Sequence, residues 1–287
     1  MIRRLILLAV ALAALAGGGW MAWRQNDAQN QWVRVTEYTV THRQIPAGMD
    51  GYKLLYLTDL HNAPFADQIC RIIQGYAPDC ILLGGDLVQL PDVDPETDME
   101  QVWAILDRYA DEIPTYFVSG NHETGTEYYY LIYQALKDHG AVSLEDKANR
   151  LWKGDSWVRI VGLGDPGPDV LDQEDRQRMR QTLQDLLAED EEAYTILLCH
   201  RSNAYAFLQD LPADLMLSGH MHGGVVRLPL VGGVFGNDDE RLFPRYDYGV
   251  FQESDMTLIV SGGCDKNPAK RRFWNPPEVV LVTLRQG

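Results

Sequence analysis

Short motifs of histidine, aspartate and asparagine recur between residues 59 and 222, and their side chains are of the types that bind transition metals. Two carboxylates, five imidazoles and one amide make a donor set that suits Mn, Fe or Zn better than an all-oxygen calcium site. A lone histidine is more often a hydrogen-bonded core residue, but an ordered set of this kind indicates a metal centre. The motifs are Asp59-Leu60-His61, Gly85-Asp86, Gly120-Asn121-His122-Glu123, His200 and Gly219-His220-Met221-His222.

Two divalent ions roughly 3.5 to 4 Å apart can share a bridging hydroxide and clamp a phosphoryl group for in-line attack. Such a pair needs a bridging carboxylate, and Asp86 is the natural candidate because it is the isolated acid of the set. In an extended segment residues i and i+2 project to the same side, so Asp59 and His61 could reach one ion. The same would hold for His220 and His222 if that turn is locally extended. Glycines before three of the motifs' polar residues would let the backbone turn tightly.

Each motif directly follows an apolar run that is typical of a buried strand. The ligands of open α/β sheets collect beyond the carboxyl ends of the strands, so the motifs are expected to converge at one edge. We therefore predict one mixed α/β domain. Strands are expected at 32–40, 53–58, 80–83, 115–119, 194–199, 215–217, 248–252, 256–261 and 279–284, helices at 66–76, 99–110, 128–139 and 171–191, and a hairpin at 150–162 that turns at Gly154-Asp155.

The N-terminus contains an uncharged stretch from Leu5 to Trp23 that is long enough to cross a bilayer as a helix. Trp20 and Trp23 stand where an interfacial aromatic belt would lie, which favours a retained signal anchor. A cleaved signal peptide is the competing interpretation, because small residues (Ala11, Ala13, Ala14) offer cleavage contexts.

Arg3 and Arg4 favour a cytoplasmic N-terminus, although Arg24 and Arg34 weaken the contrast. We therefore expect a single-pass protein of the cell membrane whose catalytic domain lies outside the cytoplasm. Residues 1–31 would form the anchor with a short linker, and 32–287 the catalytic domain.

The charge balance of the chain restricts its partners. Lys and Arg number 25 against 41 Asp and Glu, and the net charge of -16 argues against nucleic acid as a partner. A small phosphorylated substrate remains compatible, and the oligomeric state is not indicated. The four cysteines form no close pair that would suggest a zinc knuckle, and most are expected to be small buried residues. A bridge between Cys70 and Cys80 has no support beyond the predicted export.

In this order the motifs DxH, GD, GNHE, H and GHxH resemble those of the calcineurin-like metallophosphoesterase superfamily. Residues 243–249 and 273–279 further resemble the membrane-associated bacterial branch that includes the YkuE-like and YaeI-like phosphoesterases. The resemblance implies a four-layer α/β/β/α sandwich with two metal ions at the strand ends. It also implies hydrolysis of a phosphomonoester, phosphodiester or pyrophosphate bond by metal-bound hydroxide. One departure is Val225, which stands where that branch commonly has glutamine.

The resemblance also assigns roles to single residues. His122 would face the substrate phosphate without binding metal, and there it would stabilise charge or protonate the leaving oxygen. Glu123 either orients His122 or caps the following helix. The ligands implied for the first metal are Asp59, His61, Asp86 and His222, and those for the second are Asp86, Asn121, His200 and His220.

A lipid-linked or cell-envelope phosphate is the substrate class that the anchor and the resemblance favour. The alternative from another class is a non-catalytic, membrane-anchored envelope protein that uses the metal site to bind phosphorylated ligands. A metal-dependent amidohydrolase is weaker, because the motif spacing does not call for a closed barrel. His42 and His139 are interpreted as structural. The apolar, glycine-rich segment 225–236 could line a pocket for a lipid or sugar group or form an edge strand and turn, and we assign it no site.

Overall fold

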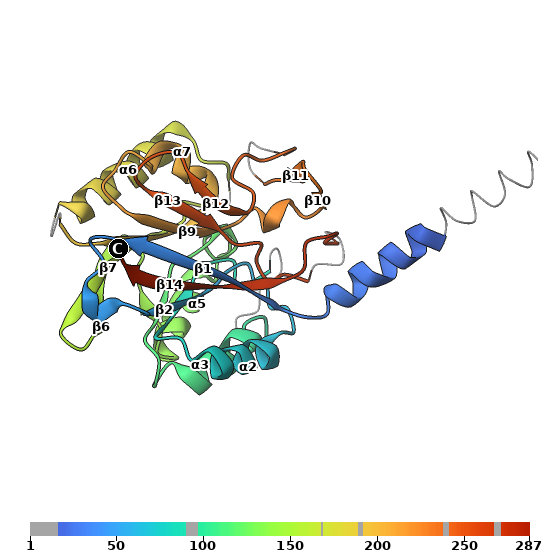
Figure 1. Cartoon of the computed structure of the whole chain (residues 1–287), viewed down its shortest axis with the longest axis horizontal. Coiled ribbons are helices and arrows are strands. Elements are labelled where there is room, and N and C mark those ends of the chain that lie inside the picture. Colours follow the sequence, from blue (N-terminus) through green and yellow to red (C-terminus); the bar gives the residue numbers. More distant parts are fainter. Residues whose placement is uncertain (1–16, 90–96, 168, 189–191, 238–240, 267–270) are drawn as a thin grey trace, which may run out of the picture.

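Two six-stranded β-sheets face each other, with helices on their outer sides (Figure 1). The computed structural model describes residues 17–89, 97–167, 169–188, 192–237, 241–266 and 271–287. The predicted mixed α/β class is confirmed. The layers run from α2 and α3, through the first sheet and the second sheet, to α6 and α7.

The first sheet has the order β1-β14-β2-β3-β4-β5. Strands β2 to β5 are parallel, β14 runs antiparallel to β2, and β1 pairs with β14 in parallel. The N-terminal strand begins two residues later than expected. The strands are β1 (Arg34–His42), β2 (Lys53–Leu57), β3 (Cys80–Leu83), β4 (Thr115–Phe117), β5 (Val142–Ser143) and β14 (Glu278–Gln286).

The second sheet has the order β12-β13-β9-β8-β7-β6. Strands β13, β9, β8 and β7 are parallel, and the edge strands β12 and β6 are antiparallel to their neighbours. The predicted hairpin is β6 and β7. The bounds are β6 (Lys147–Lys153), β7 (Ser156–Leu163), β8 (Thr195–Arg201), β9 (Leu215–Gly219), β12 (Gly249–Gln252) and β13 (Thr257–Val260), with a separate small hairpin of β10 (Arg227–Leu228) and β11 (Gly232–Gly233).

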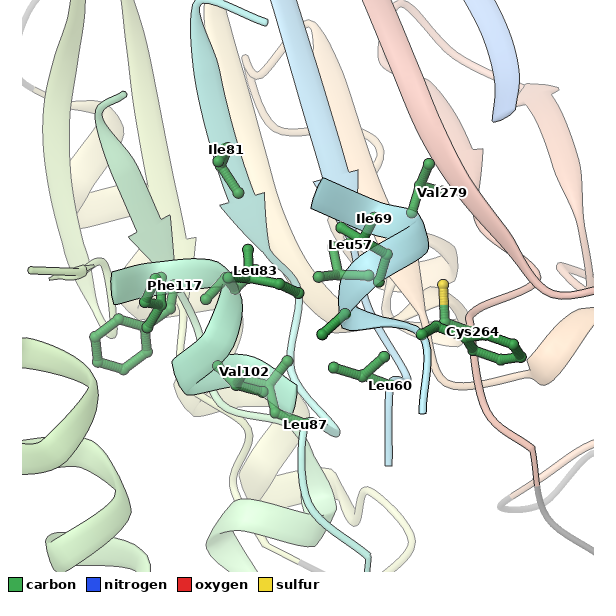
Figure 2. Packing of buried hydrophobic residues seen from close by; sticks show 14 of the residues in the cluster. Leu57, Leu60, Ile69, Ile81, Leu83, Leu87, Val102, Phe117, Cys264 and Val279 are labelled. Atoms are coloured by element: carbon green, nitrogen blue, oxygen red, sulfur yellow. The ribbon is translucent and has the colours of Figure 1, made fainter. Parts of the chain in front are cut away.

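The helices bury apolar faces against the sheets. Figure 2 shows Ile69 and Val102 among Leu57 and Leu83 of the first sheet, and each such side chain contributes about 1.5–3 kcal/mol when buried. The second core lies between the sheets, and the third lies beneath α6 and α7. The helices are α2 (Ala66–Tyr76), α3 (Glu100–Tyr109), α4 (Asn121–Thr124), α5 (Tyr129–Asp138), α6 (Gln173–Leu187) and α7 (Tyr205–Leu208), with 3-10 turns at Ala47–Met49, Ser202–Ala204 and His222–Gly224.

Short apolar strands deliver polar side chains to one edge of the molecule. Strand β3 is the run Cys-Ile-Leu-Leu, buried on both faces, and Gly84-Gly85-Asp86 follows it at once. Because β2, β3 and β4 are parallel, their carboxyl ends meet at the same edge. Strands β8 and β9 end in the same way in the second sheet.

The N-terminal helix, described over residues 17–29, is attached to the loop before β14. Buried Asn26 donates to the carbonyl of Arg272 at 2.9 Å and accepts from the backbone N–H of Trp274 at 2.8 Å. Among the described residues, no helix has the length and apolarity needed to span a membrane. Most of the predicted span lies in residues 1–16, outside the described part of the chain.

All four cysteines are buried and carry free thiols. The bridge between Cys70 and Cys80 is not formed. Burial raises the pKa of the Cys199 thiol to about 12, so the thiol stays protonated at neutral pH.

Candidate metal centre

The structure brings the motif histidines and aspartates together at the edge where the two sheets meet. Two groups of side chains each place their ligand atoms within 4.8 Å of one another, a span that could hold a metal ion. One group contains Asp59, His61, Asp86 and His222, and the other contains Asp86, His200 and His220.

Asp86 lies at the middle of this arrangement. Its Oδ2 atom is 3.3 Å from Nε2 of His200 and 3.7 Å from Nε2 of His61. His220 reaches the same region, with Nδ1 3.3 Å from Nε2 of His200, and Nε2 of His222 is 3.8 Å from Oδ1 of Asp59. Asp86 is therefore the residue common to both groups, as a bridging carboxylate would be.

Two buried atoms of the candidate ligands have no hydrogen-bond partner. They are Nε2 of His61 and Oδ1 of Asn121. A buried polar atom without a partner costs about 1–3 kcal/mol, and a cation would remove that cost. Asp59 and Asp86 are also buried carboxylates whose ion-pair partners among the described residues are histidines. The residues present thus fit divalent cations.

The expectation that the ligand pairs lie in extended backbone is wrong. Asp59 and His61 have φ angles of 50° and 46°, and His220 and His222 have φ angles of 70° and 48°. Strand β2 ends before Asp59, and the following turn is held because the Asp59 and His61 N–H groups donate to the carbonyls of Gly85 and Asp86 at 3.0 Å. The side chains converge through left-handed turns rather than through strand alternation.

The motif glycines act in two ways. Gly85 has φ of +89°, a left-handed conformation that glycine adopts without steric cost. Gly120 is extended, but a Cβ there would lie 2.3 Å from Oδ1 of Asp86. The predicted tight turn is therefore present at Gly85, whereas Gly120 is needed for close approach.

The candidate histidines are oriented by hydrogen bonds on the ring atoms that face away from the centre. Nδ1 of His61 is 2.9 Å from the carbonyl of Val88, and Nδ1 of His200 is 2.8 Å from that of Gly84. Nδ1 of His222 is 2.9 Å from Oδ1 of Asp265. Such contacts fix the tautomer of a metal-binding histidine and turn the other nitrogen inward.

Burial and the two aspartates set opposite protonation preferences in neighbouring rings. Burial lowers the pKa of His61 to about 4, because its aspartate neighbours only partly compensate. Burial also opposes charge on His200, but Asp86 and Asp59 outweigh it and raise the pKa of His200 to about 10. The same contacts hold the pKa of Asp86 well below its usual range, although burial alone would raise it. Without a cation, a proton on His200 supplies the positive charge that Asp86 requires.

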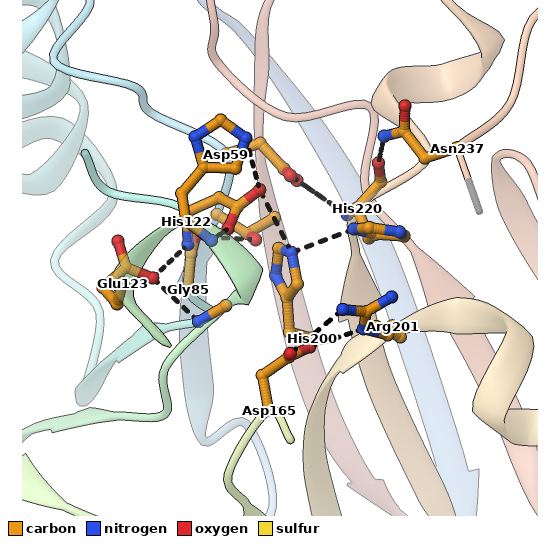
Figure 3. Close-up of polar contacts among 12 residues, drawn as sticks. Asp59, Gly85, His122, Glu123, Asp165, His200, Arg201, His220 and Asn237 are labelled. Atoms are coloured by element: carbon orange, nitrogen blue, oxygen red, sulfur yellow. Dashed lines mark hydrogen bonds and ion pairs between the residues drawn. The ribbon is translucent and has the colours of Figure 1, made fainter. Parts of the chain in front are cut away.

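His122 lies beside the two groups but belongs to neither. Its Nε2 is 3.9 Å from Oδ2 of Asp86, its ring packs edge-on against His61, and its side chain is 20% exposed. His122 stands at the start of α4 (Figure 3), and its backbone N–H donates to Oδ1 of Asp86 at 2.9 Å. Burial lowers its pKa, so the neutral ring predominates at pH 7 and keeps one N–H to donate.

Glu123 joins two of the motifs through their backbones. Its carboxylate accepts from the N–H groups of Asp86 at 2.8 Å, Leu87 at 2.7 Å, Val88 at 3.1 Å and Gly120 at 2.7 Å. Figure 3 draws two of these four bonds. The bond from Gly120 caps α4, the short helix to which Glu123 itself belongs, rather than the helix that follows it. Burial and the charge of Asp86 raise its pKa to about 7.

Replacing Glu123 by glutamine should lower both the stability of the fold and the affinity of the site for a divalent cation. The amide would point an N–H donor at backbone N–H groups, so the free energy of unfolding should fall by about 1–3 kcal/mol. Urea unfolding of the metal-free protein and titration with Mn²⁺ measure the two effects. Glu112→Gln, at an exposed position, is the control. Unchanged stability and affinity would contradict this role.

The sequence interpretation missed residues that support the candidate ligands from other loops. Asp265 contacts His222 and pairs with Arg272. It follows β13 and Gly262-Gly263, a pattern like that before Asp86, and this signal could have identified it. Asn237 donates to the backbone carbonyl of His220 (Figure 3). Their partners lie far away in the sequence, which local patterns do not reveal.

His42 and His139 have contacts of their own. Nδ1 of His139 is 2.5 Å from Oδ1 of Asp107, and its ring stacks on Trp103. His42 ends β1 and lies 3.9 Å from Asp214. Both fit the structural interpretation.

Metallophosphoesterases from bacteria and from a vertebrate are similar to this chain along most of its length. This chain is 26% identical over 284 residues to the metallophosphoesterase YkuE of Bacillus subtilis (strain 168). The match covers 96% of this chain and 94% of the relative. It is 29% identical over 248 residues to phosphodiesterase YaeI of Escherichia coli (strain K12), covering 81% and 82%. A transmembrane protein with a metallophosphoesterase domain from Bos taurus is 26% identical over 266 residues, covering 88% of this chain and 57% of the relative.

The family model described as calcineurin-like phosphoesterase matches residues 52–224, a stretch that begins just before β2 and ends two residues after His222. That stretch covers more than half of the chain and contains every motif of the candidate centre. The relatives also support the narrower resemblance to YkuE and YaeI. The chain therefore belongs to the calcineurin-like phosphoesterase family.

Proposed function

We propose that this protein is a binuclear metal-dependent phosphoesterase that hydrolyses a phosphomonoester, phosphodiester or pyrophosphate bond. The position of Asp86 carries the proposal, because its carboxylate belongs to both groups of side chains that could hold a cation. Two divalent ions there would polarise a phosphoryl oxygen and acidify a bound water. The mixture of imidazole, carboxylate and amide donors suits Mn, Fe or Zn.

The proposed ligand sets share one carboxylate. Asn121 is assigned to the second set because its buried Oδ1 has no hydrogen-bond partner and because it follows Gly120, where a Cβ would lie 2.9 Å from the ring of His200. His122 donates its ring N–H to the phosphoryl group or the leaving oxygen. The first ion would be held by Asp59, His61, Asp86 and His222, and the second by Asp86, Asn121, His200 and His220.

We also propose that this protein crosses the cell membrane once. Its proposed substrate is a lipid-linked or cell-envelope phosphate. Residues 1–31 form the anchor, and 32–287 form the catalytic domain outside the cytoplasm. The uncharged stretch Leu5 to Trp23 supports this placement. Two relatives, from Bos taurus and Danio rerio, are named as transmembrane proteins.

Chelation and reloading test the proposed activity. The purified full-length protein should lose hydrolysis after treatment with a chelator and regain it with Mn²⁺, Fe²⁺ or Zn²⁺. The panel contains a phosphomonoester, a phosphodiester, a nucleotide sugar and a phospholipid. A contrary result is that the reloaded protein binds inorganic phosphate and hydrolyses no member of the panel. That result would overturn the proposed enzymatic activity and support the non-catalytic alternative.

A further inference from the structure

Large apolar side chains are exposed on the side of the molecule that carries the β10–β11 hairpin. Leu230 is fully exposed at the tip of the hairpin, and Phe243 and Leu242 are 58% and 61% exposed. Single exposed apolar residues are ordinary, but a continuous group marks an interaction surface. We name as the apolar rim the residues Leu228, Leu230, Val231, Phe235, Leu242, Phe243 and Trp274.

Backbone contacts make this group continuous. Arg227 at the start of the hairpin donates to the carbonyl of Phe273, which precedes Trp274. Phe235 bridges to Leu242, and the Phe243 N–H donates to Val234. The backbone segments that carry the rim residues are therefore adjacent to one another.

Three rim residues have a left-handed backbone conformation, which is strained for residues with bulky side chains. Leu230, Phe243 and Trp274 have φ angles of 68°, 54° and 52°. Turns of this kind normally use glycine or asparagine, because a bulky residue there is strained. These positions thus combine backbone strain with an exposed apolar side chain, and such outliers indicate a function outside the fold.

The rim is built directly onto the loop of the candidate metal centre. The Phe235 N–H donates to the carbonyl of Gly224 at 3.0 Å, two residues after His222. Arg227 links the hairpin to Gly223 at 2.9 Å and to Asp247 at 2.7 Å. A partner that covers the rim therefore lies next to the centre.

The N-terminal helix identifies the partner. It projects from the same side as β10 and β11 (Figure 1), and Asn26 ties it to Trp274. It carries exposed Trp20, Met21 and Trp23, and the uncharged stretch from Leu5 runs into it. Exposed tryptophan, leucine and phenylalanine are the side chains that settle at the boundary between lipid headgroups and acyl chains.

We infer that the apolar rim docks on a lipid bilayer and holds the metal centre at the membrane surface. The docking is independent of the reaction, while its consequence, a substrate whose phosphate lies at the bilayer surface, rests on the proposed function. The rim is a second membrane contact in addition to the anchor, and two contacts fix an orientation that one helix leaves free.

Fluorescence of a labelled full-length chain in vesicles tests the docking. Leu230→Cys carries an environment-sensitive dye, which reacts selectively because the native thiols are buried. Asp155→Cys, in the exposed β6–β7 turn at the opposite end of the molecule (Figure 1), is the control. The vesicles contain phosphatidylcholine and phosphatidylglycerol. Nitroxides attached to the lipids should quench the dye at position 230 but not the dye at position 155. Iodide in the water should quench the dye at position 155 but not the dye at position 230. Equal quenching by iodide at both sites overturns the docking, and so does protection from both quenchers at 230, which would mean a second protein copy covers the rim.

A charge variant tests the consequence for substrates. Leu230→Asp should lower hydrolysis of a vesicle-embedded phosphodiester about tenfold or more and leave a water-soluble phosphodiester unchanged. Trp152→Asp, at an exposed position of β6, should change neither rate. Equal rates for Leu230→Asp and the native chain on both substrates overturn the inferred substrate class. Failure of the native chain to hydrolyse either substrate counts against the proposed function, while the fluorescence still decides the docking.

Discussion

Replacing Asp86 by alanine is expected to abolish metal-stimulated hydrolysis and to remove at least one of two bound ions. Its Oδ2 lies between His61 and His200, and its Oδ1 accepts from the backbone N–H of His122. No other described carboxylate belongs to both groups of possible ligands. Loss of several kcal/mol of transition-state stabilisation corresponds to a fall in kcat/KM of about 10³-fold or more.

Elemental analysis and hydrolysis of bis(p-nitrophenyl) phosphate measure the two effects of Asp86→Ala. Circular dichroism establishes that the variant is folded. Asp185→Ala, an exposed carboxylate on α6, is the matched control and should keep both ions and full activity. A folded Asp86→Ala protein with unchanged activity would refute the binuclear mechanism.

His122→Ala should keep its metal content and lose about 10²- to 10⁴-fold in kcat, with KM changed little. The ring lies near Asp86 at 3.9 Å but in neither ligand group, so its loss leaves the cation donors in place. Its lowered pKa favours a neutral ring that donates a hydrogen bond over one that transfers a proton. The loss should therefore be similar for phosphodiesters with good and with poor leaving groups.

His139→Ala is the control for this prediction, because that ring contacts Asp107 and Trp103 in the first layer of helices. A much larger loss for the poor leaving group would assign His122 a proton-transfer role instead. A drop in bound metal would make His122 a ligand, and an unchanged kcat would remove it from the reaction.

The sequence predicted the elements better than the shape of the loops between them. Strand β3 has the predicted bounds, because four consecutive apolar residues followed by two glycines leave little choice. The backbone at Asp59 and His61 could not be predicted, because non-glycine residues adopt left-handed angles there only when bonds to Gly85 and Asp86 hold them. Those bonds connect separate strands and leave no local pattern.

The same limit applies to the support of the candidate ligands. The motif residues were identified by type and spacing, whereas Asp265 contacts His222 across 43 positions of sequence. The sequence does not decide whether segment 225–236 lines a pocket or forms an edge strand and turn. In the structure, β10 and β11 of this segment pair with each other in a separate hairpin whose tip is exposed and apolar, so they form a turn but no edge strand of either large sheet.

The left-handed turns at the candidate ligands have a consequence for the stability of the metal-free protein. Asp59, His61, Asp86, His220 and His222 all have positive φ. Each non-glycine residue in that region costs about 1–2 kcal/mol, and less for aspartate. A domain typically has a margin of only about 5–15 kcal/mol. A cation that binds only the folded chain would offset this cost, so the metal-free protein is expected to unfold at lower temperature than the metal-loaded protein.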